Sequence, residues 1–576
     1  MKDIANLKYI LLLCHVMISY IICMTTVTKL NKKLKKAFDG KICAMLNEGV
    51  LYLTGELNDW NDIVRAGLMS VNRTQYTVVN DIVFTGCKKP IKRMPLVSSN
   101  VLEGEHPDVL VIGGGIIGCA VARELSRYKL NIMLVEKEHD VALHASGRND
   151  GVINPNLDLR KGQLKKKYSG YGYHMYPKIC RELDVPYKIT GQYLCFTENW
   201  LKPAAIISIK LHYKMNGIRA EYINHDELLK REPNISPNIK FALYFPDTGV
   251  VDPIGLTIAY AENAADNGVK VYLDTAVISI DVRSGKIEGV LTNRGRIFPK
   301  LVINAAGVFS EEIARLANDR FFSIHPKRGT SMIMDKKAVS LVNTIVSNST
   351  AVKGLYSKSG GIVHTIDNNL LVGPNTVETH EKEKFSTDKE SIKSILYMQK
   401  KIIPELNENN VITYFTGIRA ATYEDDFIVS FGKFTKNIIH AAGIQSPGLT
   451  AAPSIASEIS VMAAEYLKAV INEQFNPVRR AIIRGAGLPD DQRDALIKKN
   501  PDYGIITCCC EEISRGEIIA AMRRSIPCDT VDGIKRRVRS GMGRCQGGYC
   551  EHHVAEIIAA EKKIPLTDVK KKGLLC

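Results

Sequence analysis

The stretch that decides the fold is "DVLVIGGGIIGCAVARELSRYKLNIMLVEKE", residues Asp108–Glu138. It consists of an apolar strand, a glycine-rich turn, a helix, and a second apolar strand that leads into Glu136. The turn has the spacing G-x-G-x-x-G at Gly113, Gly115 and Gly118. In such a unit, backbone N–H groups and the positive end of the helix face a pyrophosphate, and the acidic residue accepts hydrogen bonds from ribose hydroxyls. The stretch therefore predicts a site for an adenine dinucleotide without a 2′-phosphate.

Three segments outside this unit also combine small residues with strand or turn patterns: "HASGRNDGVINP" (His144–Pro155), "LVINAAGVFS" (Leu301–Ser310) and "HAAGIQSPGLTAAPSIA" (His440–Ala456). With the strand–turn–helix unit they resemble the FAD-dependent oxidoreductases of the D-amino-acid oxidase superfamily, in which such segments line the flavin. The resemblance implies FAD as the cofactor. Beyond the three glycines and Glu136, it implies these FAD-binding residues: Ser146, Arg148, Asn149, Gly307, Gly443, Ser446, Gly448 and Leu449.

The expected fold class is α/β, with a Rossmann-like FAD-binding domain and an interleaved mixed-sheet substrate domain. On the substrate side, "HPKRGTSMIMDK" (His325–Lys336) and "FTGIRAATYEDDFIVS" (Phe415–Ser430) look most like the glycerol-3-phosphate dehydrogenase A-subunit branch and the related 2-hydroxyglutarate oxidases. In that branch two arginines, here Arg328 and Arg419, face the substrate or flavin. A guanidinium group can hold a phosphate or carboxylate in bidentate geometry while the carbinol carbon is aimed at the flavin.

Two alternatives stay open in this region. Either arginine could instead lie in an internal salt bridge, for example to Asp425 or Asp426. Members of the branch commonly carry a histidine a few residues after the S-G-R-N motif, where this chain has Asn154, and an amide cannot act as a base near neutral pH. The candidates for the proton acceptor are His325, His364 and His440.

A separate cysteine pattern lies near the C-terminal end: C-x-C in "TCCCEE" (Thr507–Glu512) and C-x4-C in "GRCQGGYC" (Gly543–Cys550). Four thiolates can bind zinc or an iron–sulfur cluster, and C-x-C is uncommon among structural zinc sites. Ser514 and Glu517 form an S-x-x-E capping box, which predicts a helix start just after the first cysteines. Helix starts direct N–H groups toward sulfur ligands.

The motifs "C-x-C-E" and "G-x-C-Q-G-G-x-C" resemble the bacterioferritin-associated ferredoxin-like domain, which is appended to several flavin dehydrogenases and binds a [2Fe–2S] cluster. The resemblance implies four ligands: Cys508, Cys510, Cys545 and Cys550. Zinc and free thiols are the alternatives. Cys509 could replace a neighbouring ligand, and two cysteines are predicted to be spare: Cys528 and Cys576.

The chain begins with an apolar stretch, Tyr9–Val27, of 19 residues without Lys, Arg, Asp or Glu. This is just long enough to cross a bilayer, and the lysines between 29 and 36 would keep the rest of the chain in the cytoplasm. Translation that begins at Met24 is the alternative. We therefore interpret residues 1–28 as a membrane anchor or a misassigned start, and expect a cytoplasmic body that is membrane-associated if the anchor is retained.

Residues 29–86 alternate strand and helix patterns around "GVLYLTGEL" (Gly49–Leu57) and predict a small α/β domain. The pattern resembles the BON domain, a module associated with membranes or with partner binding; a plain docking domain is the alternative. The remaining expected boundaries are a linker over 87–106, the oxidoreductase domain over 107–470, a connector over 471–504, a small helical iron–sulfur domain over 505–562, and a tail over 563–576.

Composition limits the function classes. Seven of the 14 cysteines lie between Cys508 and Cys576, which indicates a reducing compartment with one thiolate site and not a disulfide scaffold. The formal net charge is +16, but basic runs such as "IKRRVR" (Ile534–Arg539) lack the interleaved aromatic residues of a nucleic-acid platform. We therefore expect these runs to be solvated faces and predict no nucleic-acid partner.

A flavin and an iron–sulfur site in one chain favour an electron-transferring dehydrogenase. The interpretation is that a small anionic substrate, with glycerol 3-phosphate implied by the resemblance, reduces FAD. Electrons would then leave through the [2Fe–2S] cluster to a partner subunit or the quinone pool. The alternatives on the same scaffold are a 2-hydroxyglutarate dehydrogenase and an amine or amino-acid (proline, opine or sarcosine-like) dehydrogenase. A non-enzymatic, membrane-docked electron carrier would leave the FAD segments unexplained.

Overall fold

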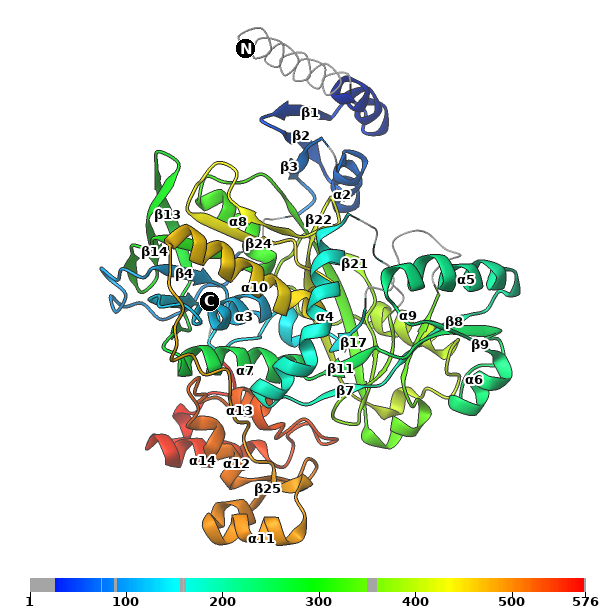
Figure 1. Cartoon of the computed structure of the whole chain (residues 1–576), viewed down its shortest axis with the longest axis vertical. Coiled ribbons are helices and arrows are strands. Elements are labelled where there is room, and N and C mark those ends of the chain that lie inside the picture. Colours follow the sequence, from blue (N-terminus) through cyan, green and yellow to red (C-terminus); the bar gives the residue numbers. More distant parts are fainter. Residues whose placement is uncertain are drawn as a thin grey trace, which may run out of the picture.

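The computed structural model describes residues 26–73, 75–87, 91–155, 159, 162–349 and 360–573. A small N-terminal sheet, a large central body and a helical C-terminal domain follow one another along the long axis (Figure 1). Of the proposed anchor, residues 1–28, only Thr26, Val27 and Thr28 are among the described residues, and Cys576 lies outside them as well. Among the helices within these ranges, none is both long enough and apolar enough to cross a membrane.

The central body is built on a six-stranded sheet in the order β12-β5-β4-β16-β24-β23. All neighbouring strands are parallel except β23, which runs antiparallel to β24. The strands β4, β5, β16 and β24 are buried throughout, which explains their uninterrupted apolar sequences. The strand bounds are β4 Val109–Ile112, β5 Ile132–Val135, β12 Lys270–Tyr272, β16 Leu301–Asn304, β23 Ile428–Phe431 and β24 Ile438–Ala442.

Helices and a small sheet cover the two faces of this central sheet. One face packs against α3 (Ile116–Leu125), α7 (Pro253–Asp266) and α10 (Gly448–Leu467), with α4 (Leu164–Leu183) outside them. The other face packs against α8 and a three-stranded sheet, β13-β14-β15. The bounds of these elements are α8 Ser310–Leu316, β13 Val277–Arg283, β14 Lys286–Thr292 and β15 Gly295–Ile297.

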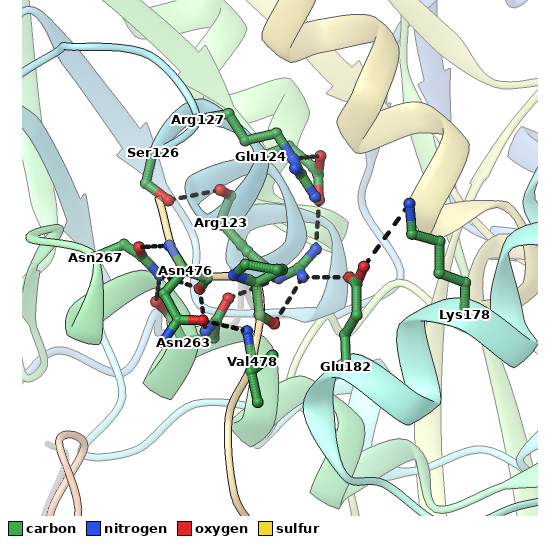
Figure 2. A network of polar contacts seen from close by, with 11 residues as sticks. Arg123, Glu124, Ser126, Arg127, Lys178, Glu182, Asn263, Asn267, Asn476 and Val478 are labelled. Carbon is green, nitrogen blue, oxygen red and sulfur yellow. Dashed lines mark hydrogen bonds and ion pairs between the residues drawn. The ribbon is translucent and has the colours of Figure 1, made fainter. Parts of the chain in front are cut away.

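A buried polar network holds the helices of the first face together (Figure 2). Arg123 of α3 is completely buried and donates to Asn263 of α7 at 2.8 Å. Its two terminal nitrogens also reach Glu124 at 2.6 Å and Glu182 of α4 at 2.7 Å. A further bond to the Pro477 carbonyl, at 3.1 Å, ties in the segment that leads to the C-terminal domain. A buried charge needs such partners. The bonds of Arg123 hold α3, the helix that follows the glycine turn, against its neighbours.

The interleaved part of the body is a nine-stranded mixed sheet in the order β21-β17-β20-β19-β18-β8-β10-β9, with β22 paired to β17. Helices α6 (His225–Arg231) and α9 (Lys389–Lys400) cover one face, and α5 (Lys202–Ser208) packs on the other. The strands are β8 Gln192–Phe196, β9 Glu221–Asn224, β10 Phe241–Phe245, β17 Ile324–Met334, β18 Ile345–Asn348, β19 Gly361–His364, β20 Leu370–Gly373, β21 Val377–Glu378 and β22 Val411–Thr422. A smaller sheet joins β6 (Val152–Ile153), β11 (Gly249–Val251) and β7 (Tyr187–Ile189). The expected fold class is confirmed.

Two small units complete the chain. The N-terminal unit has a helix over 26–37 and a sheet in which β2 pairs antiparallel with β1 and parallel with β3. The C-terminal unit has a short hairpin and three helices around its own apolar core, and the predicted Ser514–Glu517 capping box is present at the start of α12. The bounds are β1 Ile42–Asn47, β2 Val50–Leu57, α2 Trp60–Met69, β3 Thr77–Phe84, α11 Asp490–Lys499, β25 Ile506–Cys508, β26 Ile513–Ser514, α12 Arg515–Met522, α13 Val531–Val538 and α14 Glu551–Lys562.

Candidate functional site

The glycine turn after β4 is too crowded for side chains. A Cβ on Gly113, which has a φ of +117°, would lie 2.5 Å from the Ala305 carbonyl oxygen, and a Cβ on Gly118 would lie 1.9 Å from the Gly113 carbonyl oxygen. Gly115 is the N-cap of α3 and makes no side-chain cap. The first turn of α3 therefore presents backbone N–H groups, the arrangement that binds a pyrophosphate.

Glu136 lies directly after β5 and beside this turn. Its carboxylate accepts hydrogen bonds from the backbone N–H groups of Gly114, at 2.5 Å, and Glu138, at 2.9 Å. Burial raises the pKa of Glu136 despite these bonds. The residue is thus placed where a dinucleotide ribose would meet the carboxyl end of β5.

The S-G-R-N motif folds over the N-terminus of α3. The Ser146 hydroxyl accepts a hydrogen bond from the Ile116 N–H at 2.8 Å. Asn149 closes the turn: its amide donates to the carbonyls of Ala145 and Ser146 and accepts from the Gly151 N–H at 2.9 Å. In this arrangement Asn149 shapes the turn, while Ser146 reaches the helix N-terminus.

Arg148 connects this turn to the mixed sheet. Its guanidinium donates to the carbonyl oxygens of Leu143, at 2.9 Å, and Thr416 of β22, at 3.3 Å. It also lies over the ring of Phe385, 4.3 Å from the ring centre. Burial lowers the pKa of Arg148. The sequence analysis missed Phe385, which belongs to no motif and approaches only because the loop after β21 folds back.

The other predicted FAD-binding residues follow β16 and β24 at the same edge of the central sheet. Gly307 has a φ of +55° and faces open space, whereas a Cβ on Gly443 would lie 2.6 Å from Thr422 Cγ2. Gly448 begins α10, just after Ser446, and the Leu449 carbonyl accepts from the Tyr176 hydroxyl at 2.5 Å. The structure therefore gathers all twelve predicted positions at the carboxyl ends of parallel strands, where α/β folds bind cofactors.

Arg328 and Arg419 lie on neighbouring strands but on opposite faces. In the β17–β22 pair, Arg328 stands opposite Ile418, and Arg419 stands opposite Lys327. Because successive side chains of a strand alternate between faces, the two guanidinium groups point to different sides of the sheet. The structure does not bring the two arginines into one site.

The two arginines also have different bonding partners. Arg328 forms an ion pair with Asp388, the N-cap of α9, so it occupies an internal salt bridge, though not with the acidic residues considered from the sequence. Arg419 donates to the Asn375 carbonyl at 3.4 Å and the Thr376 hydroxyl at 3.1 Å. Burial lowers the pKa of Arg419, and the Asp150 charge opposes this shift.

Arg419 is on the face that meets the flavin turn. A Cβ on Gly417, two residues earlier on the same strand, would lie 2.5 Å from the Arg148 carbonyl oxygen. A Cβ on Gly329 would lie 2.8 Å from the Arg419 guanidinium, so the missing side chain at 329 makes room for it. Of the two arginines, Arg419 is the one that faces the S-G-R-N segment.

The three histidines considered as bases all have protein partners. His325 stacks on Tyr423, with ring centres 4.6 Å apart, and contacts Glu378 at 3.1 Å. His440 is completely buried against Asp319 at 2.7 Å. His364 contacts the Asn368 side chain at 3.3 Å. Their partners indicate structural roles, so the proton acceptor stays unassigned.

The four predicted metal-binding cysteines converge as two pairs. The Cys510 and Cys545 thiols contact each other, and so do the Cys508 and Cys550 thiols. Burial opposes ionisation of Cys545, but backbone N–H groups of the loop that follows outweigh it and lower its pKa. Cys509, which lies between Cys508 and Cys510 in sequence, belongs to neither pair and is exposed. The N–H groups around Cys545 are those expected around a thiolate ligand.

The pairing fits two metal ions better than one. Tetrahedral zinc with four thiolates needs sulfur separations of about 3.8 Å. In the described ranges, no three of these sulfurs lie within 4.8 Å of one another. A [2Fe–2S] cluster takes two thiolates on each iron, which matches two sulfur pairs. Another cysteine of the domain, Cys528, packs into its apolar core.

Comparison with known proteins follows this division. Residues 108–461 match the family model "FAD dependent oxidoreductase", and residues 506–560 match "BFD-like [2Fe-2S] binding domain". A glycerol 3-phosphate dehydrogenase of Caloramator mitchellensis is 38% identical over 469 residues, which cover 81% of this chain and 96% of that protein. A glycerol 3-phosphate oxidase of Mycoplasma genitalium is 31% identical and is covered over 97% of its length by 64% of this chain.

Among solved structures, the reduced L-alpha-glycerophosphate oxidase of Mycoplasma pneumoniae with FAD bound superposes with a TM-score of 0.61 and 28% identity. The match covers 65% of this chain and 98% of that one. The expectations of FAD and of a [2Fe–2S] cluster as cofactors are confirmed by these similarities. The crowded glycine turn and the paired thiols are local features that fit the same two groups.

Proposed function

Because this chain belongs to the FAD dependent oxidoreductase family, we propose that it is a dehydrogenase whose substrate is glycerol 3-phosphate. The names of the similar proteins from Caloramator and Mycoplasma support this substrate. The chain spans 96% of the Caloramator protein, so the support extends over both cofactor regions.

The observation that carries the proposal is the position of Arg419. Its guanidinium is buried on the face that meets the flavin turn, where it donates to a carbonyl and a hydroxyl and interacts electrostatically with Asp150. A guanidinium buried beside the flavin turn favours an anionic ligand, and its planar geometry matches that of a phosphate. We therefore assign Arg419 to hold the phosphate of the substrate, and we assign Arg328 to the anchoring of α9.

The cofactors would be held by the residues described above. The first turn of α3 would bind the pyrophosphate of FAD, and Glu136 the ribose. The ligands proposed for the cluster are Cys508, Cys510, Cys545 and Cys550. When bound, FAD takes two electrons from the alcohol carbon of a substrate, and a [2Fe–2S] cluster carries electrons singly to an acceptor.

The acceptor and the outer domains complete the proposal. We propose that the electron acceptor is a partner subunit or a quinone. We also propose that the oxidoreductase domain spans residues 107–470 and the iron–sulfur domain residues 505–562. Residues 29–86 would act like a BON domain and dock the protein to a partner or a membrane. The ranges of the matching family models support the oxidoreductase and iron–sulfur domains. A three-stranded sheet of its own supports the domain over 29–86.

A second candidate is an amino-acid or amine dehydrogenase, and Asn154 is the observation that favours it. Oxidation of an alcohol needs a base to accept the hydroxyl proton, whereas an amine substrate only has to be neutral. The described histidines considered as bases are held by other partners, and an asparagine stands at the position where the resembled branch commonly carries a histidine.

The test is anaerobic reduction of the bound flavin. The purified chain is mixed with glycerol 3-phosphate, 2-hydroxyglutarate or proline, and the flavin absorbance near 450 nm is followed. We expect rapid bleaching with glycerol 3-phosphate only. Bleaching by proline alone would replace the first candidate with the second, and bleaching by 2-hydroxyglutarate alone would reassign the anion bound at Arg419.

A further inference from the structure

The C-terminal domain contacts the FAD-binding segment through one buried acidic residue. Asp140 accepts from both terminal nitrogens of Arg537, at 2.8 and 3.0 Å, and from Arg536 at 2.8 Å. The side chains of Asp140 and Arg537 are 3% and 2% exposed. The run "IKRRVR" is therefore not the solvated face expected from the sequence, since its central arginines are buried between two domains.

Asp140 lies in the short loop that joins the ribose-binding position to the flavin turn. Its carboxylate also accepts from the Val141 N–H at 2.9 Å, and the next residue, Ala142, donates from its N–H to the Gly114 carbonyl at 3.0 Å. Ala142 has a φ of +64°, a conformation that surrounding contacts must hold in a residue other than glycine. Movement of Asp140 would therefore move a backbone segment that touches the glycine turn.

The same loop supports the S-G-R-N turn. A Cβ on Gly147 would lie 2.2 Å from the Ala142 carbonyl oxygen, so the two segments are in direct backbone contact. The loop that Asp140 holds is thus packed against both segments that line the dinucleotide site. A shift of this loop would change the shape of the site without removing any FAD-binding residue.

Helix α13 holds the other side of this contact. Arg537 also donates to the Ile526 carbonyl of its own domain at 3.0 Å. At the end of the helix, Arg539 reaches Asp367, in the loop between β19 and β20, at 2.7 Å and Glu511, next to Cys510, at 3.1 Å. Figure 1 shows α13 on the side of the C-terminal domain that faces α7 of the body. The helix therefore connects the loop that contains Asp140 with the segment that contains Cys510.

We propose that the iron–sulfur domain forms part of the FAD-binding site, with Arg537, assisted by Arg536, acting through Asp140 as a positioning residue for FAD. Without these arginines, a carboxylate would be left buried and unpaired, and it would draw its loop toward water. The proposal concerns FAD binding by the full chain and is independent of which substrate reduces the flavin.

The test measures the rate at which the full-length holoenzyme releases FAD on dilution, followed by the rise in flavin fluorescence. We expect Arg537→Gln to release FAD about tenfold faster than the wild type, within the range of ordinary coupling between sites. Arg537→Lys keeps the charge but not the bidentate geometry, so it should fall between the two. The iron content of each variant is measured in parallel to show that the C-terminal domain is intact.

The matched control is Arg524→Gln. Arg524 also joins the C-terminal domain to the body, through a 2.7 Å ion pair with buried Glu262 of α7. This contact does not involve the loop that contains Asp140. We expect its FAD release rate to stay within twofold of the wild type. Equal acceleration in Arg524→Gln and Arg537→Gln would overturn the proposal, because general loosening of the domain would explain both.

A wild-type release rate in Arg537→Gln would also overturn it. If that variant does not fold, Arg536→Gln and Arg537→Lys decide the question, because each retains at least one positively charged group on Asp140. Unchanged FAD release in both of these milder variants would reject the positioning role. Faster release in both, with full iron content, would support it.

Discussion

The ring of Tyr423 occupies the space that a side chain at position 67 would need: a Cβ on Gly67 would lie 2.2 Å from Tyr423 Cε1. Tyr423 directly follows β22, the strand that carries Arg419, and its hydroxyl accepts a hydrogen bond from Asn80 at 2.8 Å. Glu424 then accepts from the Val78 N–H at 2.7 Å. The N-terminal unit is thus packed onto the end of a strand that lines the candidate site.

We expect Gly67→Ala to destabilise the protein despite the higher helix propensity of alanine. Overpacking of this kind costs about 1–3 kcal/mol, which exceeds the gain of up to about 1 kcal/mol from propensity. Thermal unfolding and limited proteolysis of the N-terminal unit would measure the effect. Gly487→Ala is the control, since a Cβ there has no neighbour within 4 Å; equal stability of the two variants would show that Tyr423 moves aside freely.

The opposite faces of the two site arginines predict different kinetic effects. Arg419→Met should raise the KM for glycerol 3-phosphate about 10- to 100-fold, the value of one or two charged hydrogen bonds. Arg328→Met should leave KM within a few-fold of the wild type and lower stability, because it removes the ion pair with Asp388. Anaerobic flavin reduction at increasing substrate concentration measures both. A larger KM effect from Arg328 would reverse the assignment.

The pairing of thiols predicts which cysteine substitutions remove the cluster. We expect Cys545→Ser to lose most of the iron and the electron paramagnetic resonance signal of the reduced cluster, because each pair needs both sulfurs. Cys509→Ser should retain both, since this thiol belongs to neither of the two pairs. Iron analysis and spectroscopy of the dithionite-reduced proteins compare the two variants. Loss of the cluster in Cys509→Ser would place that residue among the ligands.

The buried contact at Asp140 predicts a stability change at acid pH. Burial opposes its ionisation, but Arg537 and Arg536 outweigh this and lower its pKa from 3.8 to about 2. A lowered folded-state pKa contributes stability that is present above pH 4 and is lost as pH falls toward 2. The free energy of unfolding of the wild type should therefore fall by about 2 kcal/mol more than that of Asp140→Asn between pH 5 and pH 2.

Chemical denaturation at several pH values within this window measures the difference. Asp490→Asn is a suitable control, because the Asp490 side chain is 97% exposed and far from any buried ion pair between domains. A wild-type curve parallel to that of Asp140→Asn would show that the carboxylate gains no stability from its two arginines.

The network around Arg123 predicts a large loss of stability (Figure 2). Arg123→Met would leave Glu124 and Glu182 without their buried partner, at a cost of about 3–5 kcal/mol. Arg127→Met removes a neighbouring arginine of the same helix that is 37% exposed, and it should cost less than about 1 kcal/mol. Denaturant unfolding compares the two variants. Similar losses in the free energy of unfolding would show that burial of Arg123 does not add to the stability gained from its ion pairs.

Patterns within short segments of sequence predicted much of the fold and the site. The strand–turn–helix unit at Asp108–Glu138 is recognisable because each strand is buried on both faces and the turn excludes side chains. The capping box at Ser514 was predicted correctly because both of its hydrogen bonds join residues three positions apart. The cysteine motifs likewise depend on spacing within two loops.

Contacts between distant segments could not be predicted in the same way. The two arginines looked equivalent in sequence, but the pairing register of β17 and β22 puts them on opposite faces. The basic run at Ile534–Arg539 looked solvated, but Asp140 lies almost 400 positions away in sequence and its contact with Arg537 exists only after both domains have packed. Nothing in either segment alone indicates the other.

The sequence by itself thus determined the family and the two cofactor types, because these depend on local backbone geometry and on the spacing of cysteines. Only the tertiary structure decided which arginine faces the flavin turn and how the thiols pair. It also decided that the iron–sulfur domain contacts the loop that contains Asp140. These features depend on strand register and on the burial of charges between segments far apart in the chain, and a buried charge finds its partner only when the whole fold is in place.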